Sequence, residues 1–159
     1  MKTMTKLFLF VVIITAMISC DYGPKATLNN NFEPWQNNMP IDFKKLIGTY
    51  ELDSISKKKY GIDLKEKLAL EIKEDSTFFT EKYVDNETGK IILKPKKGNI
   101  YIYNPKNKTD VYFMELQDLN LKTTELNNRK KDSTVALYVL SKGYNRKESD
   151  YLRYIKREK

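Results

Sequence analysis

The stretch Leu46-Ile47-Gly48-Thr49-Tyr50-Glu51-Leu52 decides the fold class of this 159-residue chain. Its even-numbered positions carry apolar residues and one glycine, whereas Thr49 and Glu51 occupy odd-numbered positions. Such period-two alternation is typical of a β-strand that buries one face and exposes the other to water. The same alternation returns further along the chain, which predicts an all-β domain.

Further strands are indicated by short apolar or aromatic runs separated by polar residues. The run at 134–141 (TVALYVLS) is the strongest, because β-branched and aromatic residues are enriched in strands. The others lie at 68–73, 77–84, 90–94, 99–103, 110–116, 120–126 and 151–156. The last run also permits a helix, because Leu152 and Ile155 are three residues apart.

Turn-forming residues predict how these runs are connected. Glu74-Asp75-Ser76 predicts a tight turn, and residues 85–89 predict a hairpin loop in which Gly89 takes a positive φ. A second hairpin is predicted around Pro95-Lys96-Lys97-Gly98. Residues 41–46 favour a single helical turn that is capped by Asp42.

About eight short strands joined by tight turns predict an antiparallel up-and-down meander. An open sheet of that length leaves two edges exposed, and closure into a barrel removes both edges. The sequence therefore predicts an all-β barrel of about eight strands over residues 42–159.

The first twenty residues have the organisation of a secretory signal peptide. Lys2 and Lys6 form a positive start, an apolar run follows at 7–14, and small residues precede Cys20. The apolar stretch is shorter than the roughly 20 residues that a membrane-spanning helix needs. We therefore predict a signal peptide at 1–19, a flexible Asn- and Pro-rich tether at 20–41, and the barrel beyond it. Phe32 and Trp35 are candidates for packing onto the barrel.

Met17-Ile18-Ser19-Cys20 resembles the bacterial lipobox, with Met17 in place of the more usual leucine. The resemblance implies that Cys20 is acylated and anchors the protein to a membrane of the cell envelope. The alternative is an ordinary signal peptide with an incidental cysteine. Cys20 is the only cysteine of the chain, so an intramolecular disulfide is impossible.

The strand opening Gly48-Thr49-Tyr50, placed after a tether and before a meander, resembles the start of a lipocalin-like domain of small bacterial lipoproteins. In that group a Gly-x-Trp begins the first strand, and the Trp closes one barrel end and stacks on an Arg of the last strand. The resemblance implies that Gly48, Tyr50 and Arg153 close this barrel, with Tyr50 in place of Trp. The alternative is a strand that simply begins at a glycine.

The chain is basic, with 29 Lys and Arg against 21 Asp and Glu. Removal of Lys2 and Lys6 with the signal peptide leaves 27 against 21, a formal charge of +6. The basic residues cluster at 57–59, 94–97, 129–131 and the C-terminus. These clusters favour either attraction to anionic head groups or acidic polysaccharide, or solvated turns that discourage edge pairing. Export disfavours nucleic acid as a partner.

The residue inventory argues against enzymatic chemistry. The chain has no histidine, which excludes a Ser-His-Asp or Cys-His arrangement and a histidine-bound zinc ion. The carboxylate pairs Glu71/Asp75 and Asp85/Glu87 lie beside lysines in predicted turns, where we expect ordinary solvated charges. We therefore expect a protein that is not an enzyme and that binds no cofactor or metal.

Eleven tyrosines are the most distinctive feature of the composition. Tyr83, Tyr101, Tyr103 and Tyr138 are candidates to line a barrel mouth and bind a small apolar or amphipathic ligand. Alternatively, the tyrosines only pack the strands, and the protein is an inhibitor, an immunity protein or an accessory subunit that binds an envelope protein through its loops. The sequence leaves both functions open.

Overall fold

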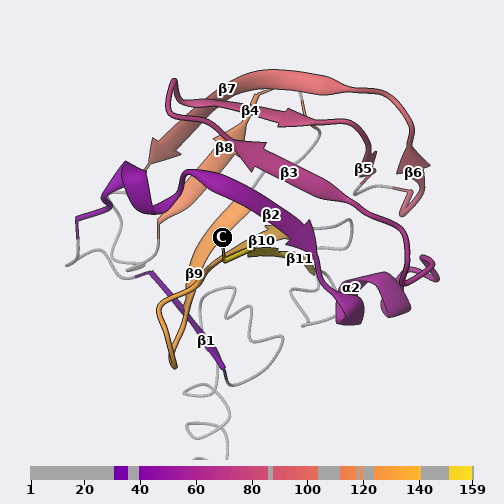
Figure 1. Ribbon diagram of the computed structural model, residues 1–159, viewed down its shortest axis with the longest axis horizontal. Coiled ribbons are helices and arrows are strands. Elements are labelled where there is room, and N and C mark those ends of the chain that lie inside the picture. The colour runs from indigo at the N-terminus through magenta and orange to yellow at the C-terminus, as the bar shows by residue number, and fades with distance from the viewer. Residues whose placement is uncertain are drawn as a thin grey trace, which may run out of the picture.

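The computed structural model describes residues 31–35, 40–85, 88–103, 112–117, 119, 124–140 and 151–158. These residues form strands, one short α-helix and one 3-10 turn (Figure 1). The elements are β1 (Phe32–Pro34), η1 (Phe43–Lys45), β2 (Gly48–Leu52), α2 (Ser54–Lys59), β3 (Ala69–Ile72), β4 (Thr77–Thr80), β5 (Tyr83–Val84), β6 (Ile91–Ile92), β7 (Lys96–Tyr103), β8 (Phe113–Leu116), β9 (Thr124–Arg129), β10 (Val135–Leu140) and β11 (Tyr151–Lys156).

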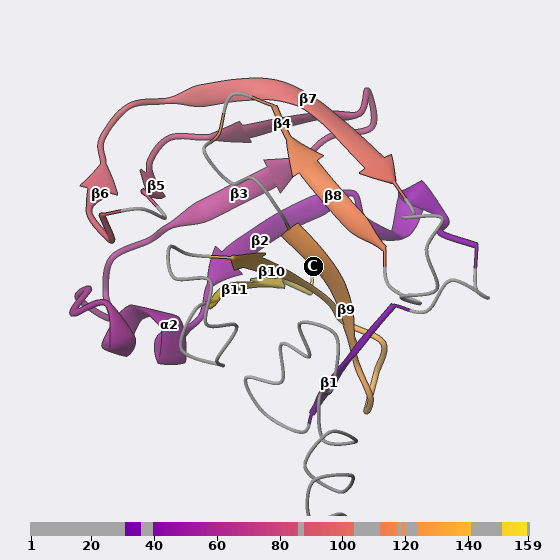
Figure 2. The same ribbon diagram turned by 180° about the vertical axis from the view of Figure 1, so that it is seen from behind.

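Eight strands close into an antiparallel barrel, which confirms the predicted fold class. The ring follows chain order through β2, β3, β4, β7, β8, β9, β10 and β11. It is closed because β11 pairs back onto β2 and β8 pairs with β9. β1 lies outside the ring and pairs with β9 beyond the point where β8 ends (Figures 1 and 2).

The alternation in the sequence places one side of each strand inside the barrel. On β2, Tyr50 and Leu52 are fully buried, whereas Thr49 is exposed. The Tyr50 hydroxyl donates a hydrogen bond of 2.7 Å to the Leu46 carbonyl, so its polar atom is satisfied inside the core. The interior is filled by apolar side chains from all around the ring, among them Phe78, Met114, Leu137 and Leu152.

Residues 151–156, whose sequence permits either a strand or a helix, form the strand β11 over their whole length. Its register places Leu152 and Tyr154 in the core. The predicted turn before β2 is also present, because the Lys44 amide donates 3.0 Å to the capping Asp42 carboxylate. Gly89 has a φ of +70°, as its place in the hairpin loop between β5 and β6 predicts.

The hairpin predicted around residues 95–98 is wrong. Residues 96–98 belong to β7, which pairs with β4 over Lys96–Asn99 and with β8 over Ile100–Tyr103. Gly98 lies in the interior of this strand. The position requires a glycine because a Cβ there would come within 2.5 Å of the Gln117 carbonyl oxygen and 2.8 Å of the Phe78 ring. A close approach of a second backbone, not a turn, therefore requires this glycine.

The folded part of the chain extends into the segment predicted as a tether. β1 lies within 20–41, and Phe32 and Trp35 are both buried, as their aromatic character suggested. The predicted signal peptide and Cys20 lie outside the described residues. Among the residues that the structure describes, no helix is long and apolar enough to span a membrane.

Candidate functional site: outer wall and rim of the barrel

The four candidate tyrosines do not converge on one mouth of the barrel. Tyr101 and Tyr103 lie on the outward side of β7 and are 51% and 42% exposed. Tyr138 is fully buried, yet it packs with the cluster on the outward side of β10, outside the main core. Tyr83 is half-buried in β5 and packs against the core.

Strand register joins two of these tyrosines in a single row across the outside of the barrel. Tyr103 lies opposite Phe113, Phe113 opposite Glu125, Glu125 opposite Tyr138, and Tyr138 opposite Arg153. We call these five residues the outer-wall row. Because residues directly opposite on neighbouring strands have adjacent side chains, the row forms one continuous strip.

One end of the outer-wall row is aromatic and partly exposed. The rings of Tyr103 and Phe113 stack with their centroids 5.9 Å apart and their planes 21° apart. Partial burial, with the nearby Glu115 carboxylate, raises the pKa of Tyr103 above its ordinary value. With the exposed Tyr101 nearby on β7, this end presents apolar area with polar tips.

The other end of the row is a buried ion pair. Arg153 is 3% exposed, and its Nε donates 2.6 Å to Oδ2 of Asp53. Its guanidinium carbon lies 4.9 Å from the centre of the Phe32 ring, and its Nη1 lies 3.5 Å from the Tyr138 hydroxyl. Asp53 also accepts from the Ser56 amide at 2.7 Å as the N-cap of α2. Arg153 therefore links β11 to the start of α2.

Arg153 makes its ring contacts with Phe32 and Tyr138, away from the Gly48-x-Tyr50 strand opening. The residue opposite Tyr50 is Lys156. The side chain of Lys156 passes so close to Gly48 that a Cβ on Gly48 would lie 2.9 Å from the Lys156 Cε. The ammonium of Lys156 donates 2.6 Å to the Lys45 carbonyl. The cation that lies opposite Tyr50 and against Gly48 is thus Lys156, not Arg153.

Glu125, in the middle of the row, is a buried carboxyl with incomplete hydrogen bonding. It is 1% exposed, and its Oε1 accepts 3.3 Å from the Asn127 amide. Within the part of the chain that the structure describes, its Oε2 and the Asn127 Oδ1 have no hydrogen-bond partner. Burial raises the pKa of Glu125 to about 7, and the Asn127 hydrogen bond offsets part of that rise. The carboxyl therefore changes its charge near neutral pH.

A hollow of about 990 Å³ opens at the end of the barrel where β2 begins and β11 ends. We call it the rim hollow. Its charged lining comprises Lys45, Lys73, Lys156 and Arg157 together with Glu71, Glu74, Asp132 and Glu158. A second hollow of about 660 Å³ shares Asp132 and Glu158 with it and adds Asn31, Arg129, Lys130 and Lys131. This end of the protein is therefore a surface of mixed charge.

The carboxylates first considered for acid–base chemistry serve turns and surface pairs. Glu71 lies 3.7 Å from the Lys73 ammonium, and Asp75 accepts from the Thr77 hydroxyl and amide, which lowers the pKa of Asp75. Asp85 accepts from the Thr88 amide at 2.7 Å, and Glu87 lies outside the described residues. In the described part of the chain, no group of three potential Cys, Asp or Glu ligands is placed to hold a metal ion.

Comparison with family models, with curated proteins and with solved structures finds no match to this chain. The fold and surface define it as a closed eight-stranded β-barrel with a packed interior, an outer-wall row and a charged rim. The sequence did not identify Glu125 as a member of the outer-wall row. It also did not identify Phe32, Asp53 and Asn127 as residues that contact this row. The polar alternation of Glu125 and Asn127 along β9 is also the signal of an ordinary solvent-facing side, so it did not single them out.

Proposed function

We propose that this protein is a lipid-anchored, non-enzymatic module of the cell envelope that binds another envelope protein through the outside of its barrel. The observation that carries the proposal is the contrast between the interior of the barrel and its exterior. Apolar side chains of the chain itself occupy the barrel interior, whereas charged and aromatic groups gather at the rim and on the outer wall.

A small apolar ligand inside the barrel has less support. Such ligands bind in open, mostly apolar pockets of a few hundred Å³ or more. The two hollows described above are lined mainly by charged and polar residues and lie at the rim. In the interior, Tyr50, Phe78 and several leucines occupy the space that a lipocalin-like ligand would need.

The rim hollow is suited to a protein partner. Its four cations and four carboxylates present both signs of charge within one concave surface. Complementary charges select the correct partner and steer its approach, whereas a partner with the opposite arrangement is repelled. The anchor rests on the lipobox-like sequence at Cys20, eleven residues before Asn31.

Site-specific photo-crosslinking in the host envelope tests this function. A photoreactive residue at the exposed Thr49 or Glu74 of the rim hollow is expected to give one discrete adduct of higher mass. The matched control is Leu93, which is 80% exposed and follows β6, away from the rim hollow. Adducts of equal yield from Leu93 and the rim, or none from any rim position, would contradict the proposal.

A further inference from the structure

We infer that the turn between β9 and β10 is a membrane-contact surface, on which Lys130 and Lys131 face the anionic lipid head groups of the membrane that carries the anchor. This inference rests on the proposed lipid anchor at Cys20. It assigns an orientation to the domain, with the β9–β10 turn toward the lipid, so that a protein partner in the adjoining rim hollow binds next to the membrane surface.

The chain enters the folded domain beside this turn. Phe32 is buried and pairs with Arg129, and the Lys130 amide donates 2.9 Å to the Asn31 carbonyl. The entry point is therefore fixed to the β9–β10 turn by a backbone hydrogen bond. Cys20 precedes Asn31 by eleven residues, which span at most about 40 Å when fully extended. The turn thus stays close to the lipid surface.

The two lysines at this turn form no ion pair with the described residues. Lys130 and Lys131 are both exposed, and the described residues place no carboxylate at ion-pair distance from either ammonium. The neighbouring Arg129 is different, because it pairs with Asp132 at 2.8 Å and with Glu158 at 3.4 Å. Among the described residues, the turn therefore offers two positive charges without a carboxylate partner, next to the point where the chain enters the domain.

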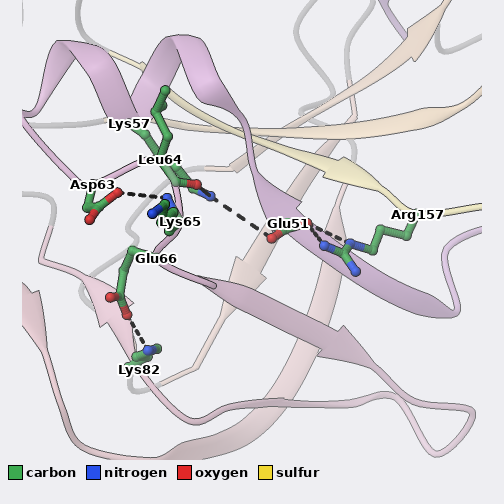
Figure 3. Close-up of polar contacts among 8 residues, drawn as sticks. All are labelled: Glu51, Lys57, Asp63, Leu64, Lys65, Glu66, Lys82 and Arg157. Atoms are coloured by element: carbon green, nitrogen blue, oxygen red, sulfur yellow. Dashed lines mark hydrogen bonds and ion pairs between the residues drawn. The ribbon is translucent and has the colours of Figure 1, made fainter.

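The basic cluster at 57–59 shows the contrast (Figure 3). Lys57 is 5% exposed, donates 3.2 Å to the Leu64 carbonyl and lies 4.0 Å from Glu51, which also binds Arg157. Lys82 and Glu66 pair in the same region. There Lys57 and Lys82 are paired within the protein, whereas Lys58 and Lys59 are exposed. The cluster follows β2, at the end of the barrel away from the rim hollow and from the chain entry at Asn31.

The balance of charge around the turn is also positive. The two adjoining hollows are lined by seven Lys and Arg side chains and four carboxylates. A lysine close to an anionic bilayer contributes on the order of a fivefold gain in binding, and screening by salt weakens that gain. Loss of both lysines should therefore weaken binding by roughly thirtyfold.

Vesicle binding of the mature chain, residues 20–159 with Cys20→Ser to remove the lipid, tests the inference. We expect binding to vesicles of phosphatidylglycerol and phosphatidylcholine, little binding to phosphatidylcholine alone, and loss of binding at high salt. Lys130→Gln/Lys131→Gln should reduce the affinity by roughly thirtyfold. The control Lys58→Gln/Lys65→Gln removes the same charge from exposed positions in and just after α2, and should have a much smaller effect.

Equal losses in the two double variants would overturn the inference, because net charge alone would then explain binding. Indifference of the unsubstituted chain to phosphatidylglycerol would overturn it as well. Palmitate labelling of the full chain in its host, with Cys20→Ser as the negative control, reports on the anchor separately. A labelled chain with equal vesicle losses overturns the orientation alone, whereas a chain without label overturns the anchor and the orientation that depends on it.

Discussion

Replacement of Arg153 by methionine is expected to lower the free energy of unfolding by about 3–5 kcal/mol. The substitution leaves the Asp53 carboxylate, whose side chain is 8% exposed, without the guanidinium that compensates its charge. It also removes the hydrogen bond to Tyr138 and the contact with the Phe32 ring. Urea denaturation at pH 7, followed by circular dichroism, measures the loss.

A second variant separates the unpaired charge from the loss of packing. Asp53→Asn combined with Arg153→Met removes both charges, and asparagine remains a good N-cap for α2. The double variant should therefore be more stable than Arg153→Met alone, because removing both partners of a buried pair costs less than removing one. Equal stability of the two variants would show that the ion pair is not coupled as the structure implies.

Substitution of Glu125 by glutamine is expected to stabilise the protein at pH 8 and to have little effect near pH 4.5. The pKa of Glu125 rises from an ordinary 4.5 to about 7 in the folded state, so the folded protein holds this proton more tightly than the unfolded chain. Stability therefore decreases as pH rises from 4.5 to 7, and the full penalty, about 3 kcal/mol, applies above pH 7. Glutamine stays neutral and avoids this penalty.

The pH dependence of unfolding checks this result. The free energy of unfolding of Glu125→Gln and of the unsubstituted chain should converge at low pH and diverge above pH 7. The matched control is Glu115→Gln on β8, because Glu115 is exposed. Parallel pH profiles for Glu125→Gln and the unsubstituted chain would show that Glu125 ionises as an ordinary surface carboxylate.

The local alternation of residues predicted much of the barrel. β2, β3 and β10 follow directly from it, because their sequences distinguish buried from exposed positions or form a strong β run. Closure also followed, because a long meander of short strands has two edges to protect. Strand alternation depends on residues that are close together in the chain, so it can be predicted from a single sequence.

The candidate site was harder to predict because it depends on register between distant strands. The pairing of β11 with β2 decides that Lys156, not Arg153, lies opposite Tyr50. A shift by one residue would reverse every side chain, and nothing local in β11 reports the register. Likewise, Glu125 belongs to a buried site because β10 places Tyr138 directly opposite it, and β11 places Arg153 on the far side of Tyr138.

The segment before the barrel shows the same limit. Asn- and Pro-rich sequence around Phe32 predicted a tether, yet Phe32–Pro34 pairs with β9 as an extra strand outside the ring. The aromatic residues Phe32 and Trp35 carried the correct signal, since burial of large rings outweighs a weak local propensity for strand.

Native mass spectrometry of the protein, extracted gently from the membranes of its own host, tests the central claim most directly. The account predicts a chain that begins at Cys20, carries the mass of the lipid anchor and has no small molecule in the barrel. Some of the chain should appear in complex with a second protein. A chain that carries a tightly bound apolar molecule would contradict the account, because the barrel interior would then be a binding site and not a packed core.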